Sequence, residues 1–347
     1  MCIRDSITTV RFAPSQTLFD GKQSHRKERK EEEEAFVASA STDGDVKVWC
    51  VATETPLTTL RGHADVCWHV RFVAPLSDAD ASLFAVTAGR DGLAKTWRVP
   101  LRVSLAAIPG RPDSVPGEDA EEAATVYPCE TLSCEATLRG HDDAILAVAT
   151  WDPPREERLF SSRVPPLAFH RSPLLATCGA DGVVVVWRVE DGAKVATLRG
   201  HAHGVLCASF VSWDDRLRLV TGSADQTVRV WDVATGACLG TIADHGAPVT
   251  DVKTRADALA TVAPGDGVMA YWRLVDDADG ASQRSESESS ESSESTRALP
   301  LGLRASATLM DGAGSGFSAC LAMDRRMLAV GTKTGAVQVL DFRRHAA

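Results

Sequence analysis

The sequence predicts an all-β fold built from a repeated unit of four antiparallel strands. The first observation is a fixed interval, because an aspartate precedes a tryptophan by six residues in five places. The second is a Gly-His or related pair whose histidine lies 14 residues after three of these tryptophans. The third is the pattern between these anchors, where short runs rich in β-branched and apolar residues end in Asp-Gly or other glycine-containing turns, as hairpins do. Two independent spacings with strand-like runs between them indicate a true repeat.

The Asp-to-Trp interval defines the units in chain order. Its five copies are Asp43 to Trp49, Asp91 to Trp97, Asp181 to Trp187, Asp225 to Trp231 and Asp266 to Trp272. A sixth unit, MLAVGTKTGAVQVLD, keeps the strand pattern with Thr334 and Leu340 in these two places. Between Asp91 and Asp181 there is one Gly-His and only 30 residues beyond the regular spacing, too few for another unit. We therefore expect six units interrupted by insertions.

Units of roughly 40 to 45 residues that open on Gly-His and close near a tryptophan resemble the WD-repeat family, across essentially residues 6–342. Among the five tryptophans, Trp231 is followed by aspartate and the others by cysteine or arginine, so the spacing carries the resemblance better than the dipeptide does. The resemblance implies a β-propeller whose blades are four-stranded antiparallel sheets.

The expected domain is a single propeller over residues 6–345 with all its insertions at one face. They are 15–34 and 152–172, between strands one and two of their units, and 100–133 and 276–302, between strands three and four. Because successive strands are antiparallel, these connections lie at the same end. Residues 1–5, MCIRD, resemble the translation of a sequencing-library adapter and are expected not to be native. We therefore expect six visible blades of a seven-bladed ring, the last lacking its outer strand.

The resemblance also implies a hydrogen-bonded tetrad in each blade, made of the Gly-His histidine, a Ser or Thr, the turn aspartate and the tryptophan. In the fifth unit, counting back four residues from Asp266 gives Val262 in the hydroxyl place, which predicts an incomplete network around His245. Since the same residue types recur in several units, we interpret them as scaffold and not as a catalytic triad. The expected sets are His63, Thr87, Asp91 and Trp97; His141, Thr177, Asp181 and Trp187; His201, Thr221, Asp225 and Trp231; and, without a histidine, Ser39, Asp43 and Trp49.

Partner binding is expected on the face without insertions, since the family usually binds peptides around the central channel. Two positions tend to line that mouth: the fifth residue after the Gly-His histidine and the residue before the turn aspartate. An apolar mouth with an arginine at its rim suits a partner segment with a hydrophobic anchor and an acidic group. The alternative is that the apolar members only fill the core. The hypothetical partner-binding residues are Trp68, Arg90, Leu146, Leu206, Thr250 and Thr42.

Composition narrows the remaining classes of function. A net charge of -10 argues against a general nucleic-acid surface, and no stretch of about 18 apolar residues could span a bilayer. The nine cysteines form no C-x-x-C pair, which indicates reduced thiols and a cytoplasmic or nuclear location. There is no glycine-rich phosphate loop or G-x-S-x-G motif, and no metal-ligand spacing around His201 and His203, so we predict neither an enzyme nor a metal or cofactor. Residues 283–296 form an acidic, serine-rich segment that is either a solvated linker or a phosphorylation site at Ser285.

The predicted function is a non-catalytic scaffold or adaptor that binds partner peptides over the propeller face without insertions. Two alternatives stay open: a subunit of a ribonucleoprotein or ribosome-assembly complex, and a substrate receptor of a ubiquitin ligase. The expected partners are other proteins, with neither a membrane nor direct nucleic-acid contact.

Overall fold

The described structure is entirely β, and none of the described residues forms a helix that could cross a membrane. The computed structural model describes residues 7–12, 36–51, 55–73, 82–100, 130–153, 172–213, 216–255, 258–265, 268–274, 303–310, 317–323, 327–332 and 337–341. The chain divides into two compact units, residues 1–140 with 189–192 and residues 141–188 with 193–347.

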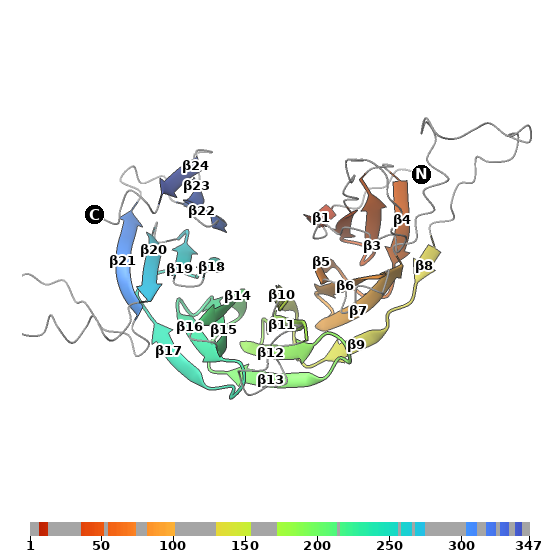
Figure 1. The fold of residues 1–347 in the computed structure, drawn as a ribbon, viewed down its shortest axis with the longest axis horizontal. Helices are drawn as coiled ribbons and strands as arrows, with labels where there is room; N and C mark the ends of the chain where they lie inside the picture. The colour runs from red at the N-terminus through yellow and green to blue at the C-terminus, as the bar shows by residue number, and fades with distance from the viewer. Residues whose placement is uncertain are drawn as a thin grey trace, which may run out of the picture. The chain divides into compact units, whose positions relative to one another are not determined.

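The first unit holds two sheets (Figure 1). The first sheet has the strand order β1-β2-β3-β4-β8 and the second has the order β5-β6-β7-β9. The strands are β1 (Ile7–Phe12), β2 (Phe36–Ser41), β3 (Val46–Cys50), β4 (Thr55–Leu60), β5 (Cys67–Val73), β6 (Ser82–Gly89), β7 (Leu93–Pro100), β8 (Glu130–Leu132) and β9 (Ala136–Arg139).

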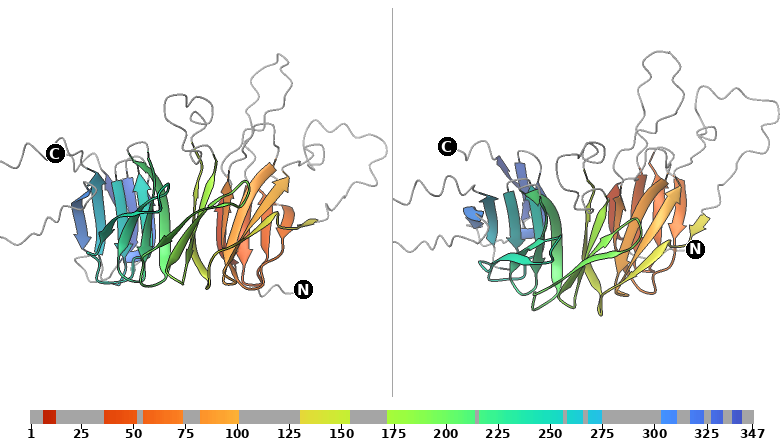
Figure 2. Two further views of the ribbon diagram at one scale, coloured as in Figure 1. Left: turned by 90° about the horizontal axis from the view of Figure 1, so that it is seen from below. Right: turned by 60° about the horizontal axis from the view of Figure 1, so that its bottom comes forward.

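The second unit holds four sheets whose strands follow chain order. Figure 2 shows its strands from two further sides, coloured from yellow through green to blue. The third, fourth and fifth sheets have four strands each, and the sixth has three described strands. The strands are β10 (Ile145–Trp151), β11 (Leu174–Gly179), β12 (Val183–Arg188) and β13 (Lys194–Arg199); β14 (Val205–Trp213), β15 (Arg216–Ser223), β16 (Val228–Asp232) and β17 (Cys238–Ile242); β18 (Asp251–Arg255), β19 (Ala258–Ala263), β20 (Val268–Leu274) and β21 (Leu303–Met310); and β22 (Phe317–Met323), β23 (Met327–Thr332) and β24 (Val337–Asp341).

The strand register explains the six-residue interval between aspartate and tryptophan. In the second sheet, Trp97 on β7 lies opposite Ala85 on β6. Side chains of alternate residues share a face, so Thr87 lies on the same face as the indole and diagonal to it. Asp91 then falls in the tight turn between the two strands, where Gly92 has a φ of +71°. The interval therefore places the aspartate at the turn and the tryptophan beside the strand hydroxyl.

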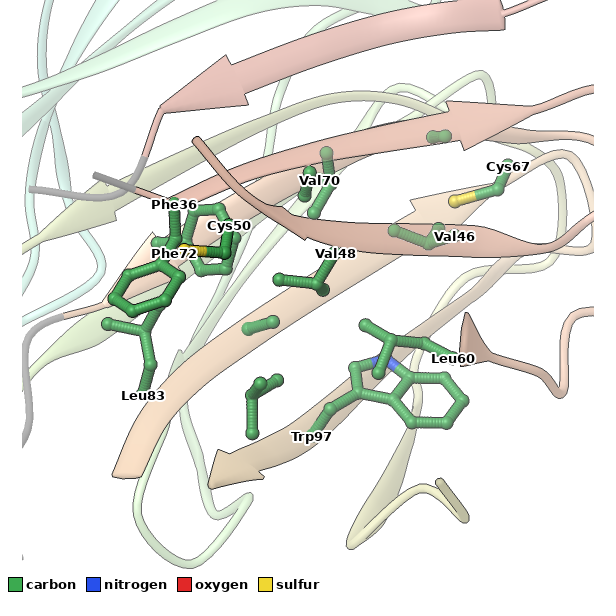
Figure 3. Close-up of a cluster of buried hydrophobic side chains, with 14 residues drawn as sticks. Phe36, Val46, Val48, Cys50, Leu60, Cys67, Val70, Phe72, Leu83 and Trp97 are labelled. Atoms are coloured by element: carbon green, nitrogen blue, oxygen red, sulfur yellow. The ribbon is translucent and has the colours of Figure 1, made fainter. Parts of the chain in front are cut away.

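Consecutive sheets within a unit pack through apolar faces of alternating residues. In the first unit, β2 contributes Phe36, Ala38 and Ala40, which are buried against side chains of the second sheet. Figure 3 shows Leu60 of β4 beside the indole of Trp97, at one end of this cluster. Similar clusters join the third sheet to the fourth and the fourth to the fifth. Each sheet therefore depends on its neighbour to bury one face.

The structure confirms the predicted fold class of antiparallel, blade-like sheets, with one addition. Glu130–Leu132, placed in the insertion 100–133, instead form β8, which pairs in parallel with β4 as a fifth strand. Pro100, at the other end of that range, completes β7. Asp152, Pro153 and Ser172 of 152–172 are also described, whereas 15–34, 276–302 and residues 1–5 lie wholly outside the described residues. The single propeller over 6–345 and its seven-bladed origin stay predictions.

The turn between the second and third strands of one sheet touches the segment that opens the next sheet. A Cβ on Gly182, at φ +75°, would lie 2.9 Å from the carbonyl oxygen of His201. In the first unit, a Cβ on Gly44 would lie equally close to a backbone oxygen of the segment before β5. A glycine is needed at these turns for both its dihedral angles and its lack of a side chain.

We expect Gly182→Ala to lower the free energy of unfolding by about 2–3 kcal/mol, since it combines left-handed strain with a backbone clash. Gly236→Ala is the matched control, because Gly236 has a φ of +72° but its nearest neighbour, Leu198 Cδ2, would lie 3.8 Å from the new Cβ. That variant should lose only about 1 kcal/mol. Urea unfolding measures both losses, and equal losses would show that the contact with the His201 segment has no energetic weight.

Candidate functional site

The tetrad of the fourth sheet is a continuous chain of hydrogen bonds. Trp231 Nε1 donates to Thr221 Oγ1 over 2.9 Å, and Thr221 Oγ1 lies 2.8 Å from His201 Nε2. His201 Nδ1 lies 2.9 Å from Asp225 Oδ2. Because the threonine oxygen already accepts from the indole, its own proton is free for Nε2, and the neutral imidazole then donates from Nδ1 to the carboxylate.

The second and third sheets repeat the same chain. In the second sheet, Thr87 Oγ1 lies 2.8 Å from His63 Nε2 and accepts from Trp97 Nε1 over 2.9 Å. His63 Nδ1 lies 2.9 Å from the Asp91 carboxylate. The third sheet joins its four predicted residues in the same order, His141, Thr177, Asp181 and Trp187. The structure therefore brings together all three complete sets that the sequence predicts.

Two backbone amides donate to each tetrad aspartate, one just after the histidine and one two residues after the aspartate. Asp225 accepts from the amide of Ala202, just after the histidine, over 2.9 Å and from the amide of Thr227 over 3.0 Å. Burial alone would raise the pKa of Asp225, but hydrogen bonds from Thr227, Ala202 and His201 outweigh it and hold the pKa well below its ordinary value. The aspartate therefore stays a carboxylate that ties the segment opening each sheet to the hairpin turn.

Burial keeps His63 and His201 neutral. It lowers the pKa of His63 and of His201 below the ordinary value, and the nearby Asp91 and Asp225 oppose this lowering only in part. A neutral imidazole can accept at Nε2 and donate at Nδ1 at once, which is what the tetrad geometry requires.

The Thr-His-Asp order matches that of a nucleophilic triad, but the surroundings favour scaffold. Thr87, Thr177 and Thr221 are fully buried. Their hydroxyl oxygens accept from an indole N–H, and because they are buried no substrate can reach them. We therefore interpret the tetrads as structural clamps.

The fifth sheet corrects one prediction. The hydroxyl partner of His245 is Thr261, whose Oγ1 lies 2.8 Å from His245 Nε2, and not a residue at the place of Val262. Trp272 follows Thr261 by 11 residues, whereas Trp97 follows Thr87 by ten, so the hairpin is one residue longer. Counting back from Asp266 assumed a constant turn length. Register gives the right answer, since Trp272 lies opposite Leu259, two residues before Thr261.

The first sheet has the reduced set that the sequence predicts. Trp49 Nε1 donates to Ser39 Oγ over 3.1 Å. The Asp43 carboxylate accepts from the amide of Asp45 over 2.9 Å, and among the described residues no imidazole bonds to it.

The hypothetical partner-binding residues lie at the tetrad end of the sheets, which is the end that carries the turn between the second and third strands. In the first unit, Arg90 donates its amide to the carbonyl of Val66 over 2.9 Å, which holds the exposed Arg90 near the start of β5, where Trp68 is half-buried. Thr42 is exposed in the corresponding turn of the first sheet.

In the second unit, the leucines at the tetrad end of the sheets lie among small residues. A Cβ on Gly204 would lie 3.0 Å from Leu146 Cδ1 and 3.2 Å from Ala180 Cα, so Leu146 packs over the segment that opens the fourth sheet. Leu146, Leu206 and Thr250 are each half-buried. Sequence reasoning did not foresee the amide-to-carbonyl bonds that anchor these turns, such as that from Ala224 to Gly204.

The remaining groups that could take part in chemistry are cysteine thiols and possible metal ligands. Burial raises the pKa of the Cys67 thiol to about 12 and also raises the pKa values of Cys178 and Cys207. Among the described residues no group of His, Cys, Asp and Glu could hold a metal ion. Ser285 lies outside the described residues.

Comparison with known proteins gives two findings. The family described as "WD domain, G-beta repeat" matches residues 192–232, which include β13 to β16. A protein of Chlamydomonas reinhardtii, "Ribosome biogenesis protein WDR12 homolog", is 28% identical over 213 residues. The match covers 54% of this chain and 37% of that relative, so the chain spans well under half of the relative's length.

We expect Thr221→Val to lower the free energy of unfolding by about 2–4 kcal/mol, because it leaves a buried indole N–H and a buried imidazole nitrogen without partners. Ser39→Ala is the matched control, since the half-buried Trp49 loses one hydrogen bond and no imidazole is involved; we expect a loss of about 1 kcal/mol or less. Both are measured by chemical denaturation. A loss for Thr221→Val no larger than that for Ser39→Ala would contradict the clamp.

The free energy of unfolding should fall as the pH drops below about 6.5, the ordinary pKa of histidine. In this range the unfolded chain takes up protons at His63 and His201, whereas burial lowers the pKa of both in the folded protein. A second loss should begin near pH 3.8, as Asp225, with its lowered folded pKa, is protonated first in the unfolded chain. Denaturation at a series of pH values tests this, and constant stability between about pH 7.5 and 5 would contradict it.

Proposed function

We propose, from the premise that this chain is a WD-repeat protein, that it is a non-catalytic scaffold that binds segments of partner proteins at the tetrad end of its sheets. One observation carries the proposal. At this end the groups capable of chemistry are buried and engaged, while apolar residues and a cation keep part of their surface free for a partner. Such a combination suits recognition by burial and charge.

In the first unit, Trp68 and Arg90 form the candidate contact. Trp68 is half-buried on β5, and the Arg90 side chain is 62% exposed with its Nε 3.7 Å from Asp65. An exposed ion pair of this length is weak, so Arg90 can turn to an acidic group of a partner at little cost. A tryptophan held by a sheet beside a mobile cation is a frequent composition of binding hot spots.

In the second unit, Leu146 and Leu206 supply an apolar contact among small residues. Ala180 and Ala224 present little side chain at this end, and both leucines keep part of their surface exposed to a partner. We propose that a hydrophobic anchor of a partner segment docks here.

A second candidate function is a part in ribosome assembly. It is favoured by the similarity to the Chlamydomonas protein, whose name places that protein in ribosome biogenesis. On this proposal the chain works in the nucleus as a protein-binding subunit, and the net charge of -10 favours contacts with proteins over contacts with RNA.

A double variant, Trp68→Ala with Arg90→Glu, tests the first function. We expect affinity for the partners recovered by the unaltered chain to fall about 30-fold or more, because an aromatic anchor and a favourable charge are both removed. Quantitative affinity purification with the full chain measures the loss.

Arg98→Ala is the matched control, because Arg98 is an exposed arginine at the opposite end of the same sheet, paired with Glu135 over 2.8 Å. It should leave the recovered proteins unchanged. Unaltered recovery by the double variant at unaltered melting temperature would reject the proposed surface, and Arg90→Glu alone serves if the double variant is unstable. Enrichment of ribosome-assembly factors among the lost partners would favour the second function.

A further inference from the structure

A strap of the chain joins the outer edge of the first sheet to the second sheet. Strand β8 pairs in parallel with β4, along Thr58 to Leu60, and after three more residues the chain enters β9 of the second sheet (Figure 1). Among the described residues no other sheet has a fifth strand. Residues 130–135, which include β8, are called the strap.

The strap covers an edge that stays open in other sheets. Thr59 of β4 is 6% exposed, whereas Thr197 and Thr241, which hold the same place in β13 and β17, are exposed. Pro56 blunts the first half of β4 against strand addition, but the half that follows, Thr58 to Leu60, carries neither a proline nor a charge. This half can therefore receive a strand, and the chain fills it with one of its own.

The groove beside the strap contains a lysine that is more deeply buried than its counterparts. Lys95 on β7 lies two residues before Trp97, on the same face, and is 7% exposed. Lys47 and Arg229 hold the same place in the first and fourth sheets, and both are half-buried. Since neither of those sheets has a strap at this groove, we attribute the deeper burial of Lys95 to the strap.

Lys95 has no acidic partner among the described residues. Its Nζ donates to Thr137 Oγ1 over 3.1 Å, and the Cys134 thiol of the strap lies 3.6 Å from the same oxygen. Glu135, the next residue of the strap, is paired with Arg98 over 2.8 Å. A lysine is rarely so buried without a counter-charge, because burial removes the water that solvates its ammonium group. The place of Cys134 is therefore one where a carboxylate would complete the groove.

We propose that the outer edge of β4 is a docking site for an extended segment of a partner protein with the pattern Leu-x-Asp or Leu-x-Glu, and that the strap occupies this site until the partner displaces it. The partner strand runs parallel to β4, as β8 does. Its leucine takes the place of Leu132, which packs against the cluster that contains Leu60 and Trp97. Its acidic residue takes the place of Cys134 and pairs with Lys95.

Competition with the strap sets the affinity of this site. The strap is tied to β9 by three residues, so it returns to β4 at an effective concentration on the order of millimolar. A partner has to exceed this, and the carboxylate that it brings to Lys95 supplies the advantage. Weakening the strap therefore strengthens binding of the partner segment, which a contact elsewhere on the surface would not do.

This site is independent of the surface proposed for the scaffold. It lies along the outer edge of the first sheet, whereas Trp68 and Arg90 lie at the tetrad end. Either proposal can fail while the other stands.

The test is a fluorescence-anisotropy titration of the full chain with the labelled peptide ETLSDEAT, which has the sequence of residues 130–137 with Cys134→Asp. The Leu132→Ser chain should bind this peptide at least about tenfold more tightly than the unaltered chain, because its own strap is weakened. On the Leu132→Ser chain, the matched peptide ETLSNEAT should bind about fivefold more weakly or worse, since the isosteric asparagine carries no charge for Lys95.

Lys95→Met, added to Leu132→Ser, should abolish the preference for the aspartate peptide. Lys47→Met is the matched control in the first sheet and should keep it. If Leu132→Ser is unstable, Thr131→Pro serves in its place, because Thr131 is exposed and proline weakens strand pairing without removing an apolar contact.

Four results would overturn the proposal. They are no binding to either strap variant at about 1 mM peptide, equal affinity for the two peptides, an unchanged preference after Lys95→Met, and binding to the unaltered chain as tight as to the strap variants. The first would leave β8 as a cover that only protects the edge of β4.

Discussion

The rest of the structure depends on one buried hydroxyl in each complete sheet. The oxygen of Thr87, Thr177 or Thr221 accepts a hydrogen bond from an indole, and the hydroxyl donates one to an imidazole. The imidazole belongs to the segment that opens the sheet, and the indole belongs to its third strand, so a single side chain joins two distant parts of the chain. Each bond is worth about 1 kcal/mol, but the penalty for leaving the buried partners unsatisfied is larger and acts against any other arrangement. The tetrad thereby selects one register and one place for the opening segment.

This selection makes neighbouring sheets interdependent. The glycines before His63 and His201 lie against a tryptophan edge, and the turn glycine of one sheet approaches the backbone that opens the next, as Gly182 does at His201. Both faces of β11 are buried. Separating such a sheet from either neighbour would therefore expose apolar surface to water, which costs free energy.

Spacing in the sequence was enough to predict the fold class and the three complete tetrads, because a two-residue side-chain period and a fixed turn place Asp, Thr and Trp unambiguously. It misplaced the hydroxyl of the fifth sheet, since one extra turn residue shifts the count from Asp266 but leaves the strand pairing of Trp272 intact. It also missed β8, because Glu130, Thr131 and Leu132 are too few to show a period. Their strand conformation comes from pairing with Thr58 to Leu60, a tertiary contact that no local pattern encodes.

The tetrad groups contribute stability, and recognition is left to other side chains. At His201, the groups Thr221 and Asp225 are satisfied within the chain, so they have no capacity left for a partner. The proposed contact therefore uses side chains outside the tetrads, such as the half-buried Trp68 and the exposed Arg90.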